Sequence, residues 1–180
     1  GYEQYGIDIL MRYYDLISRN GETFLWYFPD GRPSTVETST SPEAKPTDGW
    51  GSSAMLYALV EGLAGVQDRD KLFRRLRLCP KWITAGVEKA EVKIDYKSSG
   101  AFVRYAYEHT ADKLVIKLTG SYEYVQLSLP VPANYVPGDL TFGGKKKKYI
   151  MASINQSNYL IADADVTGEC EIILGLKKKH

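Results

Sequence analysis

The chain has 180 residues, of which 44% are hydrophobic and 25% charged, and its formal net charge is +1. This composition is ordinary for a globular protein and excludes a disordered chain. A net charge so close to zero gives no reason to expect nucleic acid, a membrane surface or an acidic partner, and no apolar run approaches the roughly 18 residues of a membrane-spanning helix.

Two helices and a long polar loop between them are predicted over the first 65 residues. In residues 5–20, apolar side chains recur three or four positions apart, which is the spacing of one helix face; they are Ile7, Leu10, Met11, Tyr14 and Ile17. Asn20 and Gly21 end this helix. Residues 50–65 form a second helix, which is apolar nearly all round and ends at Gly65, so we expect it to be buried on several sides.

From Leu72 the period of the hydrophobic pattern changes from 3.6 to 2, which is typical of strands. Residues 90–98 alternate strictly, and residues 102–118 predict a hairpin that turns at 109–112. Further strands are expected at 72–78, 122–131, 148–154, 157–166 and 170–176. About eight short strands with regular turn signals predict an antiparallel β-sandwich in which one face of each sheet meets water.

The predicted fold class is therefore α+β, with two N-terminal helices followed by an antiparallel β-sandwich. Residues 1–68 form a helical hairpin with a long loop, and residues 69–180 form the sandwich. Two helices cannot by themselves surround a helix that is apolar on all sides. The loop of about 25 residues between them exceeds what a compact domain usually contains, unless the loop is functional. The sequence thus predicts that the helical part belongs to a larger helical domain.

Residues 27–68 resemble the last helical hairpin of the six-hairpin glycosidases, whose catalytic domain is an (α/α)6 toroid. The features that carry the resemblance are the Trp50 to Ala54 segment that opens the helix, the Gly62 to Gly65 segment that ends it, and the KLFRRLRLCPKW stretch that enters the sandwich. The later strands resemble the C-terminal β-sandwich of many such enzymes. The resemblance implies a carbohydrate substrate in a parent enzyme and no cofactor. It also implies that the helices need the rest of the toroid, a second polypeptide or a dimer mate.

Glycoside hydrolysis requires two carboxyl groups that flank the scissile bond. In several families of this kind the basic carboxylate lies just ahead of the last helix, and the general acid lies on a helix that this sequence does not contain. The resemblance therefore implies Glu37 as the candidate general base, Glu43 as the second choice and Asp48 as the third. Simpler interpretations stand beside these. Glu37 fits a solvated loop acid, and Asp48 occupies the position of a helix N-cap.

Trp26 and Trp50 flank the loop and are candidate substrate-binding residues, because a flat aromatic ring can stack on the C–H face of a sugar. Anchoring of the loop ends is the alternative role for both. The predicted function is that of the C-terminal portion of a glycoside hydrolase that is inactive alone. The sequence itself does not indicate a localisation; a glycosidase of this kind would be periplasmic or secreted. The alternatives are a non-catalytic carbohydrate-binding module and a purely structural sandwich.

Cys79 and Cys170 have no metal-ligand neighbours, and the sequence predicts no metal site. The two cysteines form either one disulfide or two buried thiols, with buried thiols favoured. The four lysines from Lys145 to Lys148 favour a hairpin tip or an edge strand protected by charge. A nucleic-acid site would need interleaved aromatic residues and a wider basic surface.

Overall fold

The structure, a computed structural model, describes residues 1–39, 43 and 45–179. It divides into two compact units, one made of Tyr5–Leu59 and the other of Gly1–Gln4 with Val60–His180. The boundary expected between residues 68 and 69 lies inside the second unit, because Val66–Asp70 pairs as a strand of the sandwich.

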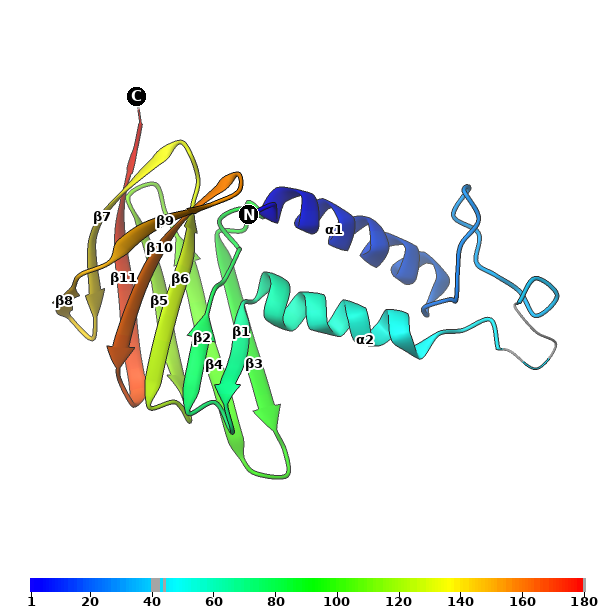
Figure 1. The fold of residues 1–180 in the computed structure, drawn as a ribbon, viewed down its shortest axis with the longest axis horizontal. Coiled ribbons are helices and arrows are strands. Elements are labelled where there is room, and N and C mark those ends of the chain that lie inside the picture. Colours follow the sequence, from blue (N-terminus) through cyan, green and yellow to red (C-terminus); the bar gives the residue numbers. More distant parts are fainter. Residues whose placement is uncertain (40–42, 44, 180) are drawn as a thin grey trace. The chain divides into compact units, whose positions relative to one another are not determined.

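The helical segments are α1 (Glu3–Asn20), α2 (Gly49–Tyr57) and the π-helix η1 (Ala58–Leu63) (Figure 1). Helix α1 ends where the sequence predicts, because Gly21 adopts a φ of 78° and its N–H donates to the Ile17 carbonyl at 2.7 Å. This is the conformation that glycine allows at a helix C-terminus. The second expected helix is present, but its final turns widen into η1.

Helix α2 is not buried on several sides, so that expectation is wrong. Met55 is its buried residue, whereas the side chains of Leu56 and Tyr57 are each 63% exposed. On α1, Ile7 and Leu10 are buried, but Met11 and Tyr14 of the same predicted face are exposed. The described chain supplies no further helix against which these apolar side chains could pack. No described helix is long and apolar enough to cross a membrane.

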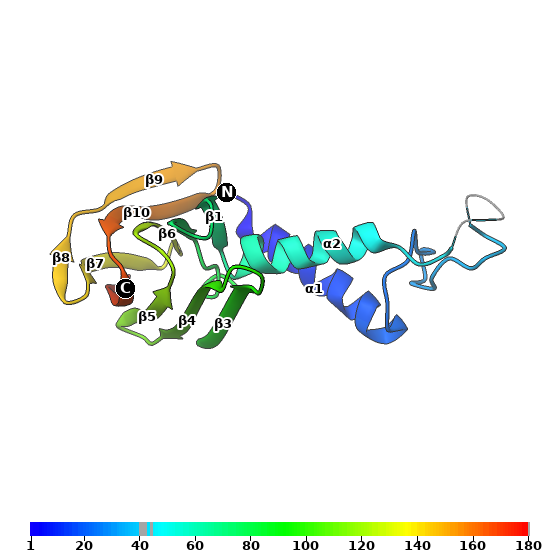
Figure 2. The same ribbon diagram turned by 90° about the horizontal axis from the view of Figure 1, so that it is seen from below.

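The sandwich contains two sheets, seen as two layers in Figure 2. The first has the strand order β1-β2-β6-β10-β9 and the second β3-β4-β5-β11-β7-β8. Their bounds are β1 (Val66–Asp70), β2 (Arg75–Leu78), β3 (Lys89–Tyr96), β4 (Ala101–His109), β5 (Lys113–Gly120), β6 (Tyr124–Val131), β7 (Tyr135–Phe142), β8 (Lys145–Lys147), β9 (Ile150–Ile154), β10 (Ser157–Asp165) and β11 (Gly168–Lys178).

The predicted α+β class with a β-sandwich is confirmed. Neighbouring strands pair antiparallel, apart from β2 and β6, which run parallel from Arg75 opposite Tyr124 to Leu78 opposite Leu127. A parallel pair needs a long crossover. Here strands β3, β4 and β5 of the second sheet lie between β2 and β6 in the chain and supply it. Lys145–Lys147 forms an edge strand, as the lysine run predicts.

The core lies between the two sheets, where the inward residues of both are buried. Two tyrosines satisfy their hydroxyl groups inside it. Tyr122 Oη donates to the Gly168 carbonyl at 2.7 Å, and Tyr105 Oη donates to the Ala64 carbonyl at 2.6 Å while it accepts from Trp82 Nε1 at 2.8 Å. Cys79 and Cys170 are buried free thiols, the alternative that the sequence favours. Burial raises the pKa of the Cys170 thiol.

The entry into the sandwich depends on Gly65. Its φ is 69°, and a side chain there would overlap the Cys79 carbonyl and the Pro80 nitrogen. Without that side chain, the Cys79 N–H donates to the Gly65 carbonyl at 2.7 Å and the Lys81 N–H donates to the Leu63 carbonyl at 2.9 Å. Gly65 therefore allows the backbone contact from which the β1–β2 ladder starts.

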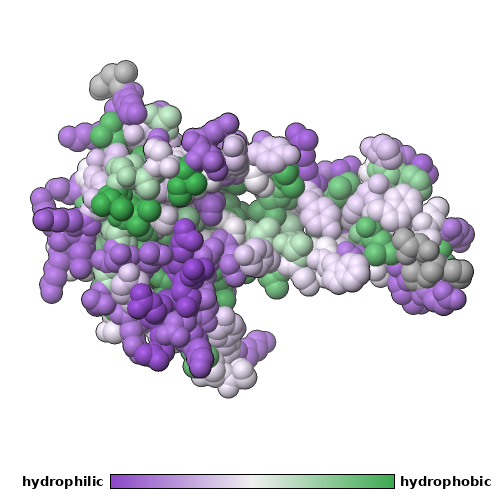
Figure 3. Space-filling view, viewed as in Figure 1, coloured by the Kyte–Doolittle hydropathy of each residue, from purple (hydrophilic) through white to green (hydrophobic). Residues whose placement is uncertain are grey.

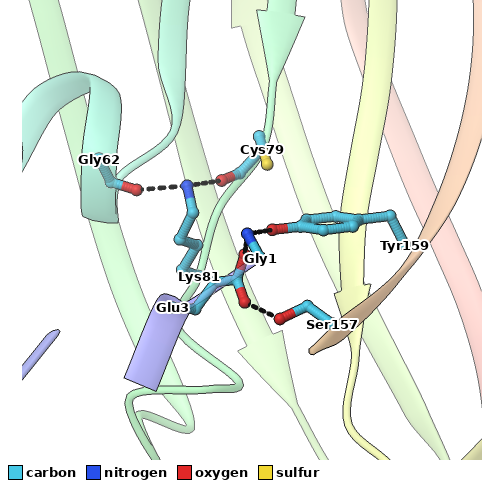
Figure 4. A network of polar contacts seen from close by, with 7 residues as sticks. All are labelled: Gly1, Glu3, Gly62, Cys79, Lys81, Ser157 and Tyr159. Carbon is cyan, nitrogen blue, oxygen red and sulfur yellow. Dashed lines mark hydrogen bonds and ion pairs between the residues drawn. The ribbon is translucent and has the colours of Figure 1, made fainter. Parts of the chain in front are cut away.

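The first residues of the chain are bound to the sandwich through Glu3 (Figure 4). The Glu3 carboxylate accepts hydrogen bonds from the Gly1 amino group at 2.8 Å and from the Ser157 hydroxyl. Burial raises the pKa of Glu3, but these two hydrogen bonds, one from its own backbone N–H and the positive charge of the amino group together outweigh it, so the pKa is lowered. Nearby, Lys81 Nζ donates to the Gly62 carbonyl at 2.6 Å and to the Cys79 carbonyl at 3.4 Å.

We predict that Gly65→Ala destabilises the chain far more than Gly100→Ala. Gly100 has a φ of 70°, but nothing lies near the position of an added Cβ, so its substitution costs only the left-handed strain of about 1–2 kcal/mol. Gly65→Ala adds an overlap with backbone that costs about 1–3 kcal/mol more. Urea unfolding of both variants measures the difference, and equal losses would contradict the role of the close approach.

His109 gives the sandwich a dependence on pH. Its Nε2 is buried without a hydrogen-bond partner among the described residues, and its ring packs edge-on against Tyr135 at 5.7 Å. Burial lowers the pKa of His109; Lys178 acts in the same direction and Glu88 opposes both. The folded chain therefore holds the neutral imidazole, whereas the unfolded chain protonates at the ordinary pKa of about 6.5.

We predict that the contribution of His109 to stability is present above about pH 6.5 and is lost as the pH falls below it, because the unfolded state then binds the extra proton. The measurement is urea unfolding of the parent chain and of His109→Phe at pH 7.5 and pH 5.5. The parent should lose more free energy of unfolding between the two pH values than the variant. Equal losses would show that His109 does not cause the dependence.

Candidate functional site

Backbone pairing joins the two ends of the loop between α1 and α2. Two isolated β-bridges join Phe24 to Thr47 and Tyr27 to Pro33. The Leu25 N–H donates to the Pro46 carbonyl at 2.9 Å. The buried Ser34 hydroxyl donates to the same carbonyl at 3.2 Å. These bonds bring the two ends of the loop together, and residues 35–38 and 43 between them are exposed.

Asp48 caps α2, as its position predicts. Its backbone is extended, with φ −135° and ψ 120°, and its carboxylate accepts from the Trp50 N–H at 2.9 Å and the Gly51 N–H at 2.7 Å. Both oxygens are thus engaged with the helix N-terminus, which is the role of an N-cap. This use of the carboxylate leaves Asp48 poorly placed to act as a general base.

Thr23 completes the base of the loop and was missed by sequence reasoning. It is buried; its hydroxyl donates to the Asp48 carbonyl and lies 2.7 Å from the Ser52 hydroxyl. The Asp48 N–H donates back to the Thr23 carbonyl at 2.9 Å. The end of α1 and the start of α2 are therefore joined by one polar cluster, which fixes where the loop leaves and returns.

Two tyrosines lie beside this cluster. The rings of Tyr13 and Tyr27 meet edge to face at 6.4 Å, and the Tyr27 hydroxyl is buried without a hydrogen-bond partner among the described residues. Burial, with Tyr27 and Asp48 nearby, raises the pKa of Tyr13, so its hydroxyl stays a hydrogen-bond donor. The one sequence signal for this packing is Gly51, where an added Cβ would overlap the Tyr13 hydroxyl.

The candidate general base, Glu37, lies in an exposed turn. A hydrogen bond from the Thr35 side chain lowers the pKa of Glu37, and its own backbone N–H acts in the same direction. A carboxylate held in its ionised form suits a base and not a general acid. The second choice, Glu43, is also exposed and in a turn, and the residues on either side of it lie outside the described part of the chain.

The two candidate sugar-binding tryptophans differ in their surroundings. Trp26 is half-buried and packs edge to face on Phe28 with ring centroids 4.5 Å apart, while the Arg32 guanidinium lies over the same Phe28 ring at 5.0 Å. Trp50 is 81% exposed at the first turn of α2. Trp26 thus has the packing of an anchor, and Trp50 has the free ring face that stacking on a sugar needs.

No group of three or more His, Cys, Asp or Glu side chains that could hold a metal ion occurs among the described residues. The helical unit contains carboxylates, tyrosine hydroxyls and tryptophan rings. These groups bind and orient hydroxylated ligands through hydrogen bonds and stacking.

We predict that Asp48→Ala weakens α2 by about 1 kcal/mol, because two helix N–H groups lose their acceptor. Asp48→Asn is the matched control, since Asn caps helices about as well as Asp. Amide hydrogen exchange at Gly51 to Met55 measures the effect. The Ala variant should exchange on the order of five times faster than the parent and the Asn variant about as fast as the parent. An unchanged Ala variant would contradict the capping role.

No family model matches the chain, and no curated protein matches it in sequence. Among solved structures, it is similar to an alpha-L-rhamnosidase from Dictyoglumus thermophilum, with a TM-score of 0.49 and 11% sequence identity. That similarity covers 77% of this chain and 15% of the rhamnosidase, so the chain spans a small part of the length of that enzyme.

Proposed function

We propose that the chain acts as the C-terminal portion of a carbohydrate-active glycoside hydrolase. In this proposal α1 and α2 complete a larger helical domain, the loop between them forms one wall of the sugar pocket, and the β-sandwich is a structural domain. The activity belongs to the assembled enzyme, because glycoside hydrolysis needs a second carboxyl group to protonate the leaving oxygen.

The observation that carries the proposal is the apolar surface of the two helices. Large side chains that a stable helical domain would bury are exposed along both of them, as the green and pale surfaces of the helical unit show in Figure 3. Tyr5 is 69% exposed and Leu56 is 63% exposed, and Trp50 is 81% exposed. The others are Ile9, Met11, Tyr14, Tyr57 and Leu59.

Exposure of this extent is unfavourable for an isolated hairpin. Each large apolar side chain that passes from water to a packed interior contributes about 1.5–3 kcal/mol, and contiguous exposed apolar surface marks an interaction site. Further helices of a toroid would supply the missing contacts; a second polypeptide or a dimer mate is the alternative. An enzyme of this kind that acts on external polysaccharide would work outside the cytoplasm.

Within this proposal, Glu37 is the general base and Glu43 the second choice. That order follows their positions ahead of α2, and the Thr35 side chain, whose hydrogen bond lowers the pKa of Glu37, keeps its carboxylate in the ionised form that a base needs. Trp50, with its exposed ring, is the candidate for stacking on the sugar. Trp26 anchors the loop by packing against Phe28. The general acid comes from a helix of the partner that covers the exposed helical faces.

The test is amide hydrogen exchange on the purified chain at two concentrations, supported by an assay on an aryl glycoside. We expect residues 60–179 to be protected at both concentrations. Residues 5–59 should exchange fast when the chain is dilute, because their apolar faces have no partner. The chain alone should not turn over the glycoside.

Two outcomes would contradict the proposal. Equal protection of both units in the dilute chain would mean that the helical unit is stable without a partner. Turnover by the chain alone would mean that the second carboxyl group is already present. Protection of residues 5–59 that rises with concentration would favour the dimer mate over a separate toroid.

A further inference from the structure

A groove of about 940 Å³ lies at the outer part of the six-stranded sheet. It forms where the chain leaves that sheet after β8 and crosses to β9 in the other sheet. Strand β8 pairs with β7 only from Phe142 to Leu140, so the preceding residues of β7 have no strand partner on that side among the described residues. The groove is lined by β7, β11, residues 146–149 and Asp112 from the β4–β5 turn.

Two glycines, which have no side chain, form part of the groove lining. Gly138 of β7 and Gly175 of β11 lie at a bulge, where the register shifts between Leu174 and Leu176. Neither has a positive φ, so their backbone does not require glycine. A Cβ at Gly175 would meet its nearest neighbours at 3.7 Å, and one at Gly138 would lie 3.4 Å from the Gly175 carbonyl oxygen. A Cβ would therefore fit at both positions, and both glycines line the groove.

The rim of the groove is basic. Four lysines line it, namely Lys146, Lys147, Lys148 and Lys177, and Figure 3 shows hydrophilic residues gathered around β8. Lys146 Nζ forms an ion pair with Asp139 at 2.8 Å. Lys147, Lys148 and Lys177 have no ion-pair partner among the described residues. The net charge of +1 therefore hides a local excess of positive charge, and attraction to anions depends on this local field.

The groove also carries groups that suit hydroxyls. The Asp112 carboxylate accepts from the Thr110 hydroxyl at 2.6 Å and retains further acceptor capacity. Tyr149 is half-buried in the lining, and its hydroxyl donates to the Pro137 carbonyl at 3.3 Å, which holds the ring in place. A ring fixed in this way presents apolar surface to a sugar.

We propose that this groove binds a short acidic saccharide, with its carboxylate or sulfate groups at the unpaired lysines and its hydroxyls at Asp112 and Asp139. The two carboxylates in the lining accept hydrogen bonds from hydroxyl groups, of which a saccharide carries several on each unit and the phosphodiester backbone of DNA carries none. The mixture of lysines, carboxylates and one tyrosine therefore fits an acidic sugar better than a nucleic acid. The site lies in the sandwich and does not depend on the proposed function of the helical unit.

The test is isothermal titration of the full chain with a galacturonic acid tetramer at low ionic strength. The fully methyl-esterified tetramer is the neutral probe, and inorganic phosphate and a single-stranded oligonucleotide are the other anions. We expect binding of the acidic tetramer that weakens as salt is added, because exposed charges are screened. The ester and phosphate should bind at least about tenfold more weakly.

Two variants locate the site. The triple variant K147Q/K148Q/K177Q removes the unpaired charges, and Gly175→Val fills the groove without changing charge; each should weaken binding by about tenfold or more. The matched control K71Q/K97Q/K117Q removes the same charge from exposed lysines that do not line the groove and should bind within about twofold of the parent. Circular dichroism and the urea midpoint confirm that each variant is folded.

Three results would overturn the proposal. The first is no binding of the acidic tetramer by a folded parent chain. The second is equal weakening by the control triple, which would show that overall charge is what matters. The third is tighter binding of the oligonucleotide with the same loss in the groove variants, which would assign the groove to nucleic acid. None of these measurements requires catalysis, so failure here leaves the proposed function of the helices standing.

Discussion

The close approach of the chain at Gly65 to Cys79 and Pro80 is the constraint on which the sandwich depends. It brings β1 and β2 together as neighbouring strands. The adjacent Ala64 carbonyl accepts a hydrogen bond from Tyr105 Oη of the other sheet at 2.6 Å. Strand β2 then pairs parallel to β6, which places the later strands of the first sheet. A buried backbone carbonyl must find a donor, so the end of η1 and both sheets are fixed together at one point.

The two units bury their apolar surface to very different degrees, and this difference separates their roles. The sandwich encloses a continuous core, so its stability is supplied by its own residues. The helices have few buried side chains, and the polar cluster around Asp48 and Thr23 fixes their ends without covering their faces. The described helices thus leave apolar faces uncovered, whereas the strands of the sandwich bury theirs between the two sheets.

The charged residues are unevenly distributed over the chain, although the net charge is close to zero. The chain has 23 basic and 22 acidic residues, yet unpaired lysines gather at the corner where β8 leaves its sheet, and the exposed acids Glu37 and Glu43 lie on the loop of the other unit. The net charge does not describe this distribution, because the field at a site depends on the charges within a few ångströms of it and not on the sum over the molecule.

The sequence alone determined what depends on local physics. The alternation in residues 90–98, the glycine end of α1, the Asp48 cap and the lysine-protected edge strand all follow from periodicity and backbone chemistry over a few neighbouring residues. Tertiary structure alone decided the parallel pairing of β2 with β6, the contact of Tyr13 with Gly51, the bare bulge at Gly138 and Gly175, and the exposure of α2. The pairings and contacts join residues far apart in the chain, and the exposure of α2 depends on which other elements pack against it. A pattern within a few neighbouring residues contains neither kind of information.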